Sequence, residues 1–261
     1  MLNRKVGELR IVSLAPSCTS IICAIGAARH LVAVTPWCSE VAPVRGLPAI
    51  GDCWRIESLE KIARLRPTLI VGSVPFHTET VARILTLPAQ FLALNPRSLG
   101  DIESDIQALA RLTNRPADGR RLTLRMRRDF ATIRRSAPKF ARPPRVYSEA
   151  WPNPRITSPP WVSEVIDLCG GKMVVKPGSR ASEEEVASAR PEVMLLAWTA
   201  TGKRADPLKS LAVPRWQTVP AILNKRVFVI ADELLNTPGP PLIAGAREIS
   251  RILKELSGVS L

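Results

Sequence analysis

One segment of this sequence occurs twice, and this repeat constrains the possible folds more than any other feature. Residues 58–71 (SLEKIARLRPTLIV) return as residues 182–195 (SEEEVASARPEVML), an offset of 124 residues. Each copy predicts a helix that begins behind a serine cap, an Arg-Pro pair that ends the helix, and a buried strand. The chain is therefore expected to contain two copies of one α/β unit.

The flanks of the two copies also correspond. A predicted strand at 10–14 precedes a helix that ends at Gly26, and a predicted strand at 145–149 precedes a helix that ends at Gly170. Strands at 90–94 and 226–230 both lead into a helix. Two similar α/β halves with a ligand cleft between them form the simplest architecture that fits this pattern.

Strands and helices alternate through both halves, which is typical of parallel sheets covered by helices on both faces. The predicted strands are 10–14, 31–35, 68–72, 90–94, 145–149, 173–175, 193–198 and 226–230. The predicted helices are 17–26, 58–66, 76–86, 99–113, 116–137, 160–169, 182–189 and 240–257, with a short one around 206–211.

The predicted domains are an N-terminal α/β lobe at 1–114, a basic connecting helix and linker at 115–143, and a C-terminal α/β lobe at 144–261. A single long helix is a stiff connector, so motion of the lobes is expected to be a rocking of a few degrees.

The length and composition fit a folded protein of this size. A chain of 261 residues suffices for two lobes with their own cores, and no apolar run reaches the length of a membrane span. The first strand is expected near Arg10, which leaves no room for a secretory signal. Five cysteines, an odd number without a C-x-x-C pair, are a poor disulfide framework. Both features favour a reducing compartment, or a start site that omits a leader.

The net charge of +14 is concentrated in one segment. Between Arg111 and Arg145 there are twelve Lys or Arg residues and only two acidic ones, Asp118 and Asp129. Such a segment could meet nucleic acid or anionic lipid. Apolar residues interleave with the charges at near-helical spacing, however, so an amphipathic helix with a solvated basic face is the favoured interpretation.

Sequence motifs for catalysis are missing. The chain has no phosphate-binding loop, no G-x-S-x-G, no H-E-x-x-H and no G-x-G-x-x-G, and it has two histidines. We therefore expect no catalytic residues, no metal site and no enzymatic activity. His30, between a helix end and a strand, is expected to cap carbonyl groups. His77 begins a helix after a strand, at the sheet edge where open α/β sheets bind ligands, and is a candidate ligand contact.

Tryptophan supplies half of the aromatic residues, six of twelve. All six are expected at strand ends or in loops, where they could line a broad apolar cleft for a large planar ligand or plug the edges of the lobes. The tryptophans are Trp37, Trp54, Trp151, Trp161, Trp198 and Trp216. Cys38, beside Trp37, is included with the candidate ligand contacts.

Glu60 and Glu184 occupy equivalent positions of the repeat, each in the first turn of a helix behind a serine. The helix dipole favours acids there, and Ser182 with Glu185 forms a predicted capping box, so local stability is one explanation. The second explanation is docking, because two matched acids on a basic protein suit a two-fold symmetric partner that carries Arg or Lys pockets.

Several segments together resemble a known family. These are residues 10–17 (RIVSLAPS), 47–51 (LPAIG), 59–70, 149–151 (EAW), 161–171 and 236–242 (NTPGPPL). They resemble the helical-backbone substrate-binding proteins of ABC importers for cobalamin and ferric siderophores, especially the cobalamin-binding branch, along nearly the whole chain. The resemblance implies two Rossmann-like lobes with parallel sheets joined by one long helix, the class III binding-protein fold.

The resemblance also implies functional roles. Trp54 corresponds to the tryptophan that flanks the corrin, and Glu60 and Glu184 correspond to the glutamates that dock on the permease dimer. Trp151, Trp161 and the loop of Asp232 fall where the second lobe meets the ligand. The implied protein is a periplasmic monomer without a catalytic cofactor, which delivers a corrinoid such as cobalamin to an ABC permease with ATPase subunits.

Alternatives remain within and outside this family. A ferric siderophore or haem would be an anionic ligand of the same fold. A cytoplasmic corrinoid carrier or sensor would fit the missing leader, and a nucleic-acid-interacting protein would use the basic helix.

Overall fold

The computed structural model describes residues 8–199, 206 and 212–256. The chain divides into two compact units. Unit 1 comprises Met1–Pro96 and Gly100–Leu124, and unit 2 comprises Arg97–Leu99 and Arg125–Leu261. Most of the short helix predicted at 206–211 lies outside the described residues.

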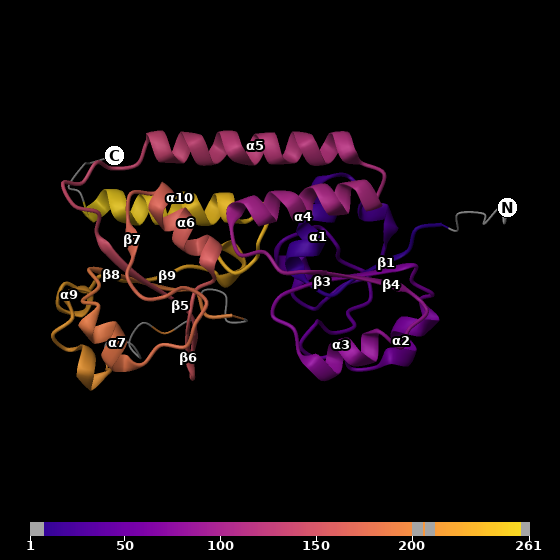
Figure 1. The fold of residues 1–261 in the computed structure, drawn as a ribbon, viewed down its shortest axis with the longest axis horizontal. Coiled ribbons are helices and arrows are strands. Elements are labelled where there is room, and N and C mark those ends of the chain that lie inside the picture. Colours follow the sequence, from indigo (N-terminus) through magenta and orange to yellow (C-terminus); the bar gives the residue numbers. More distant parts are fainter. Residues whose placement is uncertain (1–7, 200–205, 207–211, 257–261) are drawn as a thin grey trace. The chain divides into compact units, whose positions relative to one another are not determined.

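Unit 1 contains a four-stranded parallel sheet in the order β2-β1-β3-β4. The strands are β1 (Ile11–Ser13), β2 (Leu31–Ala33), β3 (Leu69–Ser73) and β4 (Gln90–Leu94). Helices α1 (Pro16–Ala24) and α4 (Leu99–Leu112) lie on one side of the sheet, and α2 (Leu59–Arg64) and α3 (Thr78–Ile84) lie on the other (Figure 1). Two short 3₁₀ helices, η1 (Ala28–His30) and η2 (Cys38–Glu40), complete the unit.

Unit 2 repeats this order with strands β7, β5, β8 and β9, all parallel. They are β5 (Arg145–Pro152), β7 (Lys172–Met173), β8 (Val193–Leu196) and β9 (Val227–Val229). The helices are α6 (Pro160–Leu168), α7 (Glu183–Ser188), α9 (Pro220–Leu223) and α10 (Leu242–Leu256), with 3₁₀ helices η4 (Pro214–Trp216) and η5 (Asp232–Leu234). Helices α6 and α10 lie on one side of the sheet, and α7 and α9 lie on the other (Figure 1).

The second sheet departs from the purely parallel prediction at one strand. β6 (Arg155–Thr157) pairs antiparallel with the end of β5, which runs on to Pro152. The chain reverses at Asn153 and Pro154, a turn-forming pair. β6 reads Arg-Ile-Thr, so it has a single apolar residue and no apolar run by which the sequence could predict a strand.

The internal repeat is confirmed at the level of single hydrogen bonds. Ser58 Oγ accepts from the backbone N–H of Lys61 at 3.2 Å, and Ser182 Oγ accepts from that of Glu185 at 3.1 Å. Only the second copy closes the full capping box, in which the Glu185 carboxylate accepts from the Ser182 N–H at 2.7 Å.

The ends of both repeated helices are also held alike. Arg10 Nε donates to the carbonyl of Leu65 at 2.9 Å, and Arg145 Nε donates to that of Ala189 at 2.9 Å. The arginine before each proline, Arg66 or Arg190, has a positive φ, 47° and 42° respectively. An arginine at the start of the first strand therefore fixes the C-terminus of the second helix in both units.

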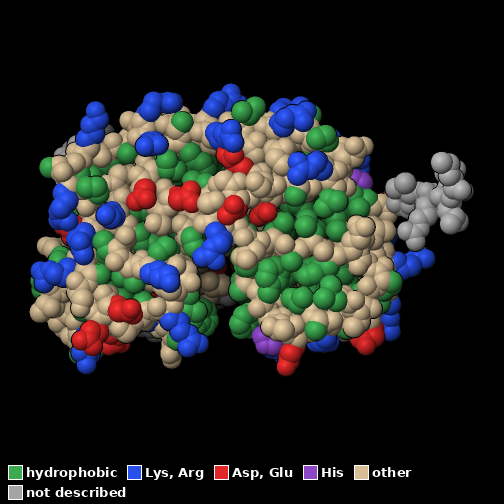
Figure 2. Space-filling model, viewed as in Figure 1, with side chains coloured by type: hydrophobic (Ala, Val, Ile, Leu, Met, Phe, Trp, Pro, Cys, Tyr) green, Lys and Arg blue, Asp and Glu red, His purple; other side chains and the backbone are tan. Residues whose placement is uncertain are grey.

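The basic segment forms α5 (Pro116–Arg135), one helix that begins in unit 1 and ends in unit 2. Its apolar residues Leu122, Met126, Phe130 and Ile133 are buried, whereas most of its arginines are exposed. Lys and Arg side chains gather along its outer face (Figure 2). The predicted amphipathic helix with a solvated basic face is confirmed. In the described part of the chain, no helix has the length and hydropathy of a membrane span.

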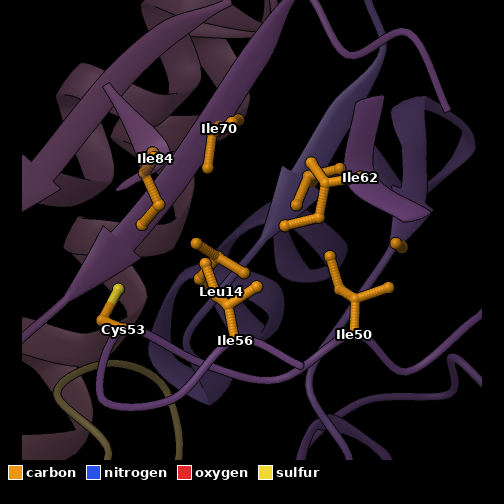
Figure 3. Close-up of a cluster of buried hydrophobic side chains, with 9 residues drawn as sticks. Leu14, Ile50, Cys53, Ile56, Ile62, Ile70 and Ile84 are labelled. Atoms are coloured by element: carbon orange, nitrogen blue, oxygen red, sulfur yellow. The ribbon is translucent and has the colours of Figure 1, made fainter. Parts of the chain in front are cut away.

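Each unit has its own hydrophobic core. In unit 1 a cluster of aliphatic side chains and Cys53 fills the space beside the sheet (Figure 3). In unit 2 the aromatic rings of Tyr147 and Trp216 meet edge to face at 6.0 Å between centroids. Trp216 is fully buried, so it is a core residue.

Candidate functional site

In unit 1, two candidate residues meet beyond the carboxyl ends of the strands. Trp54 is 57% exposed, and its ring lies 5.4 Å from that of His77 in an edge-to-face contact. His77 is half-buried at the N-cap of α3. An exposed indole beside an imidazole at this edge offers an apolar surface and a polar contact to a flat ligand.

Local hydrogen bonds hold the Trp54 loop in place. Asp52 Oδ1 accepts from the backbone N–H groups of Trp54 and Arg55, both at 2.8 Å. The Thr80 hydroxyl donates to the carbonyl of Trp54 at 2.9 Å, and the His77 N–H donates to that of Cys53 at 3.1 Å. The loop is therefore tied to the first turn of α3, which fixes Trp54 without covering its ring.

A glycine in β3 makes room for this loop. A Cβ atom on Gly72 would lie 2.2 Å from the Cys53 Sγ. Burial raises the pKa of the Cys53 thiol to about 12, so the thiol stays protonated and acts as a small apolar side chain.

The neighbouring candidates Trp37 and Cys38 differ in exposure. Trp37 is 38% exposed, whereas Cys38 is fully buried with its Sγ 3.0 Å from Thr19 Oγ1 and 3.1 Å from Thr35 Oγ1. Burial raises the pKa of the Cys38 thiol. The structure thus places Cys38 in the core, against the expectation of an exposed ligand contact, because the thiol completes a small polar cluster between α1 and η2.

In unit 2, Trp151 lies near the end of β5 and is 40% exposed. Its Nε1 donates to the carbonyl of Asn153 at 2.7 Å, so the ring is oriented by the β5–β6 turn.

Trp161 and Trp198 do not share this exposure. Both are at least 96% buried, and their indole N–H groups donate to the carbonyl of Leu235 and to Glu149 Oε1, each at 2.8 Å. The structure places both rings inside unit 2 as packing residues beneath its edge. The sequence pattern located them at element ends correctly but did not show which way the side chains point.

The 3₁₀ helix η5 follows β9 and begins at Asp232, the candidate ligand contact that the resemblance implies, which is half-buried. Two further polar residues in and after η5 were not singled out from the sequence. The buried oxygens Glu233 Oε2 and Asn236 Oδ1 accept no hydrogen bond within the part of the chain that the structure describes. The Asn236 amide donates to the carbonyl of Ala197 at 2.7 Å, one residue after β8.

A third such atom, Ser73 Oγ, lies at the end of β3 in unit 1. A buried polar atom without a partner is costly and is often satisfied by a ligand or an ordered water. Ser73 is the last residue of β3, and Glu233 and Asn236 lie in the segment that follows β9. No group of three or more histidine, cysteine or acidic residues suited to a metal ion occurs among residues 8–199, 206 and 212–256. His30, expected to contact carbonyl groups in a structural role, contacts the carbonyl of Leu9 through Nδ1 at 3.2 Å.

The two repeated glutamates are both exposed. Glu60 accepts a hydrogen bond from the Ser58 hydroxyl at 2.6 Å, and this bond lowers the pKa of the Glu60 carboxyl. Glu184 is 77% exposed and lies 4.0 Å from Arg215. Each carboxylate is thus presented to solvent in the first turn of its helix, α2 or α7.

Both α/β units have the same strand order, and aromatic and polar side chains lie beyond the carboxyl ends of their strands. These features are those of a two-lobed α/β binding protein. The model of the family described as "Periplasmic binding protein" matches residues 11–234. The chain belongs to this family, whose members are substrate-binding proteins rather than enzymes.

Relatives of this chain bind different tetrapyrrole-like ligands. A "Vitamin B12-binding protein" of Pectobacterium carotovorum subsp. carotovorum (strain PC1) is 25% identical over 259 residues, covering 95% of this chain and 89% of the relative. The periplasmic heme-binding protein RhuT of Roseiflexus sp. RS-1 superposes with a TM-score of 0.80 at 26% identity, covering 96% and 100% of the two chains. The vitamin B12 binding protein BtuF of Vibrio cholerae superposes with a TM-score of 0.72 at 24% identity over 96% and 98%.

Proposed function

We propose that this protein captures cobalamin or a related corrinoid, without catalysis, and presents it to an ABC importer. The carboxyl edges of the two sheets supply the contacts, with the exposed rings of Trp37, Trp54 and Trp151 packing against the ligand. Trp161 and Trp198 support these surfaces from within unit 2. No catalytic residue or resident cofactor is part of the proposal.

The observation that carries the choice of ligand is the chemistry of η5 and the residues just after it. Within the described residues, Glu233 Oε2 and Asn236 Oδ1 are acceptors without donors. The side chains of a corrin are largely amides, whose N–H groups would satisfy such acceptors. The propionate carboxylates of haem are themselves acceptors and would meet Glu233 with like charge.

Haem is the second candidate, because of His77. Imidazole is a common axial ligand of haem iron, and the half-buried His77 ring lies 5.4 Å from the exposed ring of Trp54. The 26% identity with the heme-binding protein RhuT adds to this alternative. A ferric siderophore shares the anionic character of haem and would meet the same acceptors on η5.

Two variants separate these ligands. Glu233→Gln removes the negative charge, so it is expected to weaken binding of cyanocobalamin and to strengthen that of haemin. His77→Ala is expected to leave cyanocobalamin affinity within about threefold, because the main loss is one polar contact. Competition between the two ligands, followed by absorbance, measures both effects. A large loss of haemin affinity in His77→Ala, together with no binding of cyanocobalamin by the wild type, would favour haem.

The proposed partner is an ABC permease dimer with its ATPase subunits, engaged through Glu60 and Glu184. The proposed compartment is the periplasm or another extracytoplasmic space. Fractionation of native cells tests the compartment, and recovery of the protein solely with cytosolic markers would contradict the transport role and favour a cytoplasmic carrier or sensor.

A further inference from the structure

Unit 2 contains a fully buried carboxylate that its fold does not require. Glu149, in β5, is 0% exposed and accepts three hydrogen bonds. The donors are Tyr147 Oη at 2.6 Å, Arg155 Nη1 at 3.0 Å and Trp198 Nε1 at 2.8 Å. Burying a charged pair costs several kcal/mol in desolvation, so such a pair rarely adds net stability over an apolar substitute.

The internal repeat supplies the comparison. Ile11 pairs with Leu69 in unit 1, and Val146 pairs with Val193 in unit 2. Since Leu69 and Val193 are equivalent in the repeat, Leu14 is the equivalent of Glu149. Leu14 is 1% exposed and packs in the aliphatic cluster of unit 1 (Figure 3). The same fold is thus built in unit 1 with an apolar residue at this position.

Arg155 connects this carboxylate to the start of α7. Its Nη2 lies 3.4 Å from Glu183 Oε1, and its Cζ lies 4.2 Å from the ring centre of Trp216. Trp216 in turn donates its indole N–H to the carbonyl of Glu183 at 2.9 Å. The carbonyl of Arg155 accepts from the N–H of Ala181 at 3.1 Å, one residue before the cap Ser182. Arg155 therefore touches both the entry and the first turn of α7, where Glu184 is exposed.

The opposite end of the network lies at the edge assigned to the ligand. Glu149 is two residues before the exposed Trp151, and Trp198 follows β8. Both neighbours of Trp198 accept hydrogen bonds from the side-chain amide of Asn236. The Ala197 carbonyl accepts at 2.7 Å, and the Thr199 hydroxyl accepts at 3.4 Å. A ligand that engages Asn236 or Trp151 would thus restrain groups bonded to Glu149.

We infer that Arg155, which is held by Glu149, is a positioning residue. It connects the first turn of α7, which carries Glu184, to the strand ends of unit 2 that are proposed to contact the ligand. This inference rests on the proposed function, which assigns docking to Glu184 and ligand contact to the strand ends of unit 2. A ligand that restrains the strand ends of unit 2 also restrains the turn that carries Glu184. Local opening of this turn becomes less frequent, and amide hydrogen exchange detects the change. Unit 1 lacks the charged pair at the Leu14 position, so the equivalent turn of α2 is not coupled in this way.

The test compares amide hydrogen exchange of residues 181–188 with that of 57–64, the matched segment of unit 1. The main variant is the neutral pair Glu149→Gln/Arg155→Met, which leaves no unpaired buried charge and is expected to keep the fold. Arg155→Lys keeps the charge beside Glu149 but lacks the second arm toward Glu183. Arg142→Gln, which removes a partly exposed ion pair with Glu192, is the control.

In ligand-free protein, the neutral pair is expected to speed exchange at 181–188 by about tenfold, the effect of losing an anchor of the turn. Segment 57–64 and the control variant should keep wild-type exchange. Arg155→Lys should retain the melting temperature of the wild type but not the protection of 181–188, an outcome that a purely structural role would not give.

With cyanocobalamin bound, wild-type protein should gain protection at 181–188, and the neutral pair should bind the ligand with similar affinity without that gain. Wild-type protection at 181–188 in the neutral pair, or an equal ligand effect in both proteins, would overturn the inference. If neither cyanocobalamin nor haemin binds the wild type, the proposed function fails, while the ligand-free comparison still decides whether Arg155 positions the turn.

Discussion

At the scale of single residues, Trp54 is the most exposed aromatic side chain of the described chain, and its backbone is held by Asp52 and Thr80. Trp54→Ala is expected to weaken binding of cyanocobalamin by about 1–3 kcal/mol, the value of covering a large aromatic face. Calorimetric titration measures the change.

Leu85→Ala provides the control for this prediction, since Leu85 is 65% exposed at the other end of α3. Its affinity should match that of the wild type. Equal affinity in Trp54→Ala and the wild type would remove Trp54 from the site.

Asp105 sets a pH dependence of stability. Burial and the charge of Asp101 raise the pKa of its carboxyl from 3.8 to about 6. A raised carboxyl pKa means that the folded state binds the proton more tightly, so stability rises as the pH falls from about 7 toward 4. Asp105→Asn is therefore expected to stabilise the protein at pH 8 by about 1–2 kcal/mol, after allowance for solvent screening, and to have little effect at pH 4.

Urea unfolding at both pH values measures this difference. Glu57→Gln, which neutralises an exposed carboxylate on the same unit, is the control and should show no comparable gain. A constant difference between Asp105→Asn and the wild type at pH 4 and pH 8 would contradict the raised pKa.

The sequence predicted the types of side chain at the site better than their exposure. Strand-end positions identified Trp54, His77 and Trp151, which the structure places on the surface or half-buried. The same positions did not distinguish Trp161, Trp198 and Cys38, because a side chain at a strand end can point into the unit or away from it. The side-chain oxygens of Ser73, Glu233 and Asn236 that lack a partner among the described residues depend on three-dimensional packing, and no sequence pattern shows them.

At the scale of elements, Gly119 allows α5 to approach α4 closely. A Cβ at position 119 would lie 2.5 Å from the Cβ of Ala110. Gly119→Ala is expected to destabilise unit 1, because this clash outweighs the gain in helix propensity of about 1 kcal/mol. Thermal unfolding measures the loss.

The double variant Ala110→Gly/Gly119→Ala should recover part of that stability, since it restores the space between the helices. A higher unfolding temperature in Gly119→Ala than in the wild type would show that the close approach of α4 and α5 does not require glycine at position 119.

Elements with strong periodicity or an apolar run were predicted nearly in place, whereas short elements without either were missed. Helix α5 was predicted at 116–137 and occupies Pro116–Arg135. Strand β6, with three residues, and the 3₁₀ helices η2 and η5 have no periodic signal, since each forms through contacts with a longer neighbour. η5 illustrates the consequence, because it carries the acceptors on which the choice of ligand depends.

At the scale of the whole molecule, the proposed docking on an importer through the repeated glutamates makes a prediction. The double variant Glu60→Lys/Glu184→Lys is expected to bind cyanocobalamin like the wild type and to lose stimulation of the transporter ATPase, because both docking charges are reversed. Glu57→Lys/Glu255→Lys reverses one exposed acid in each unit and leaves the capping box of α7 intact, so it is the control. Loss of ligand binding in the first variant would show that these acids are not docking residues.

The repeat made the overall architecture predictable, because one unit that folds with a given strand order implies the same order for its copy. The structure confirms that order in both units, down to the paired arginines that end α2 and α7. The repeat could not reveal where the copies differ. Leu14 and Glu149 look unrelated until the strand registers align them.

Calorimetric titration of the purified protein with cyanocobalamin, beside haemin and a ferric siderophore, decides whether a corrinoid is the ligand. We expect saturable one-to-one binding of cyanocobalamin at micromolar affinity or better, with a change in tryptophan fluorescence and weaker binding of the two anionic chelates. Binding of haemin or the siderophore without binding of cyanocobalamin would contradict the claim and assign the same fold to an iron chelate.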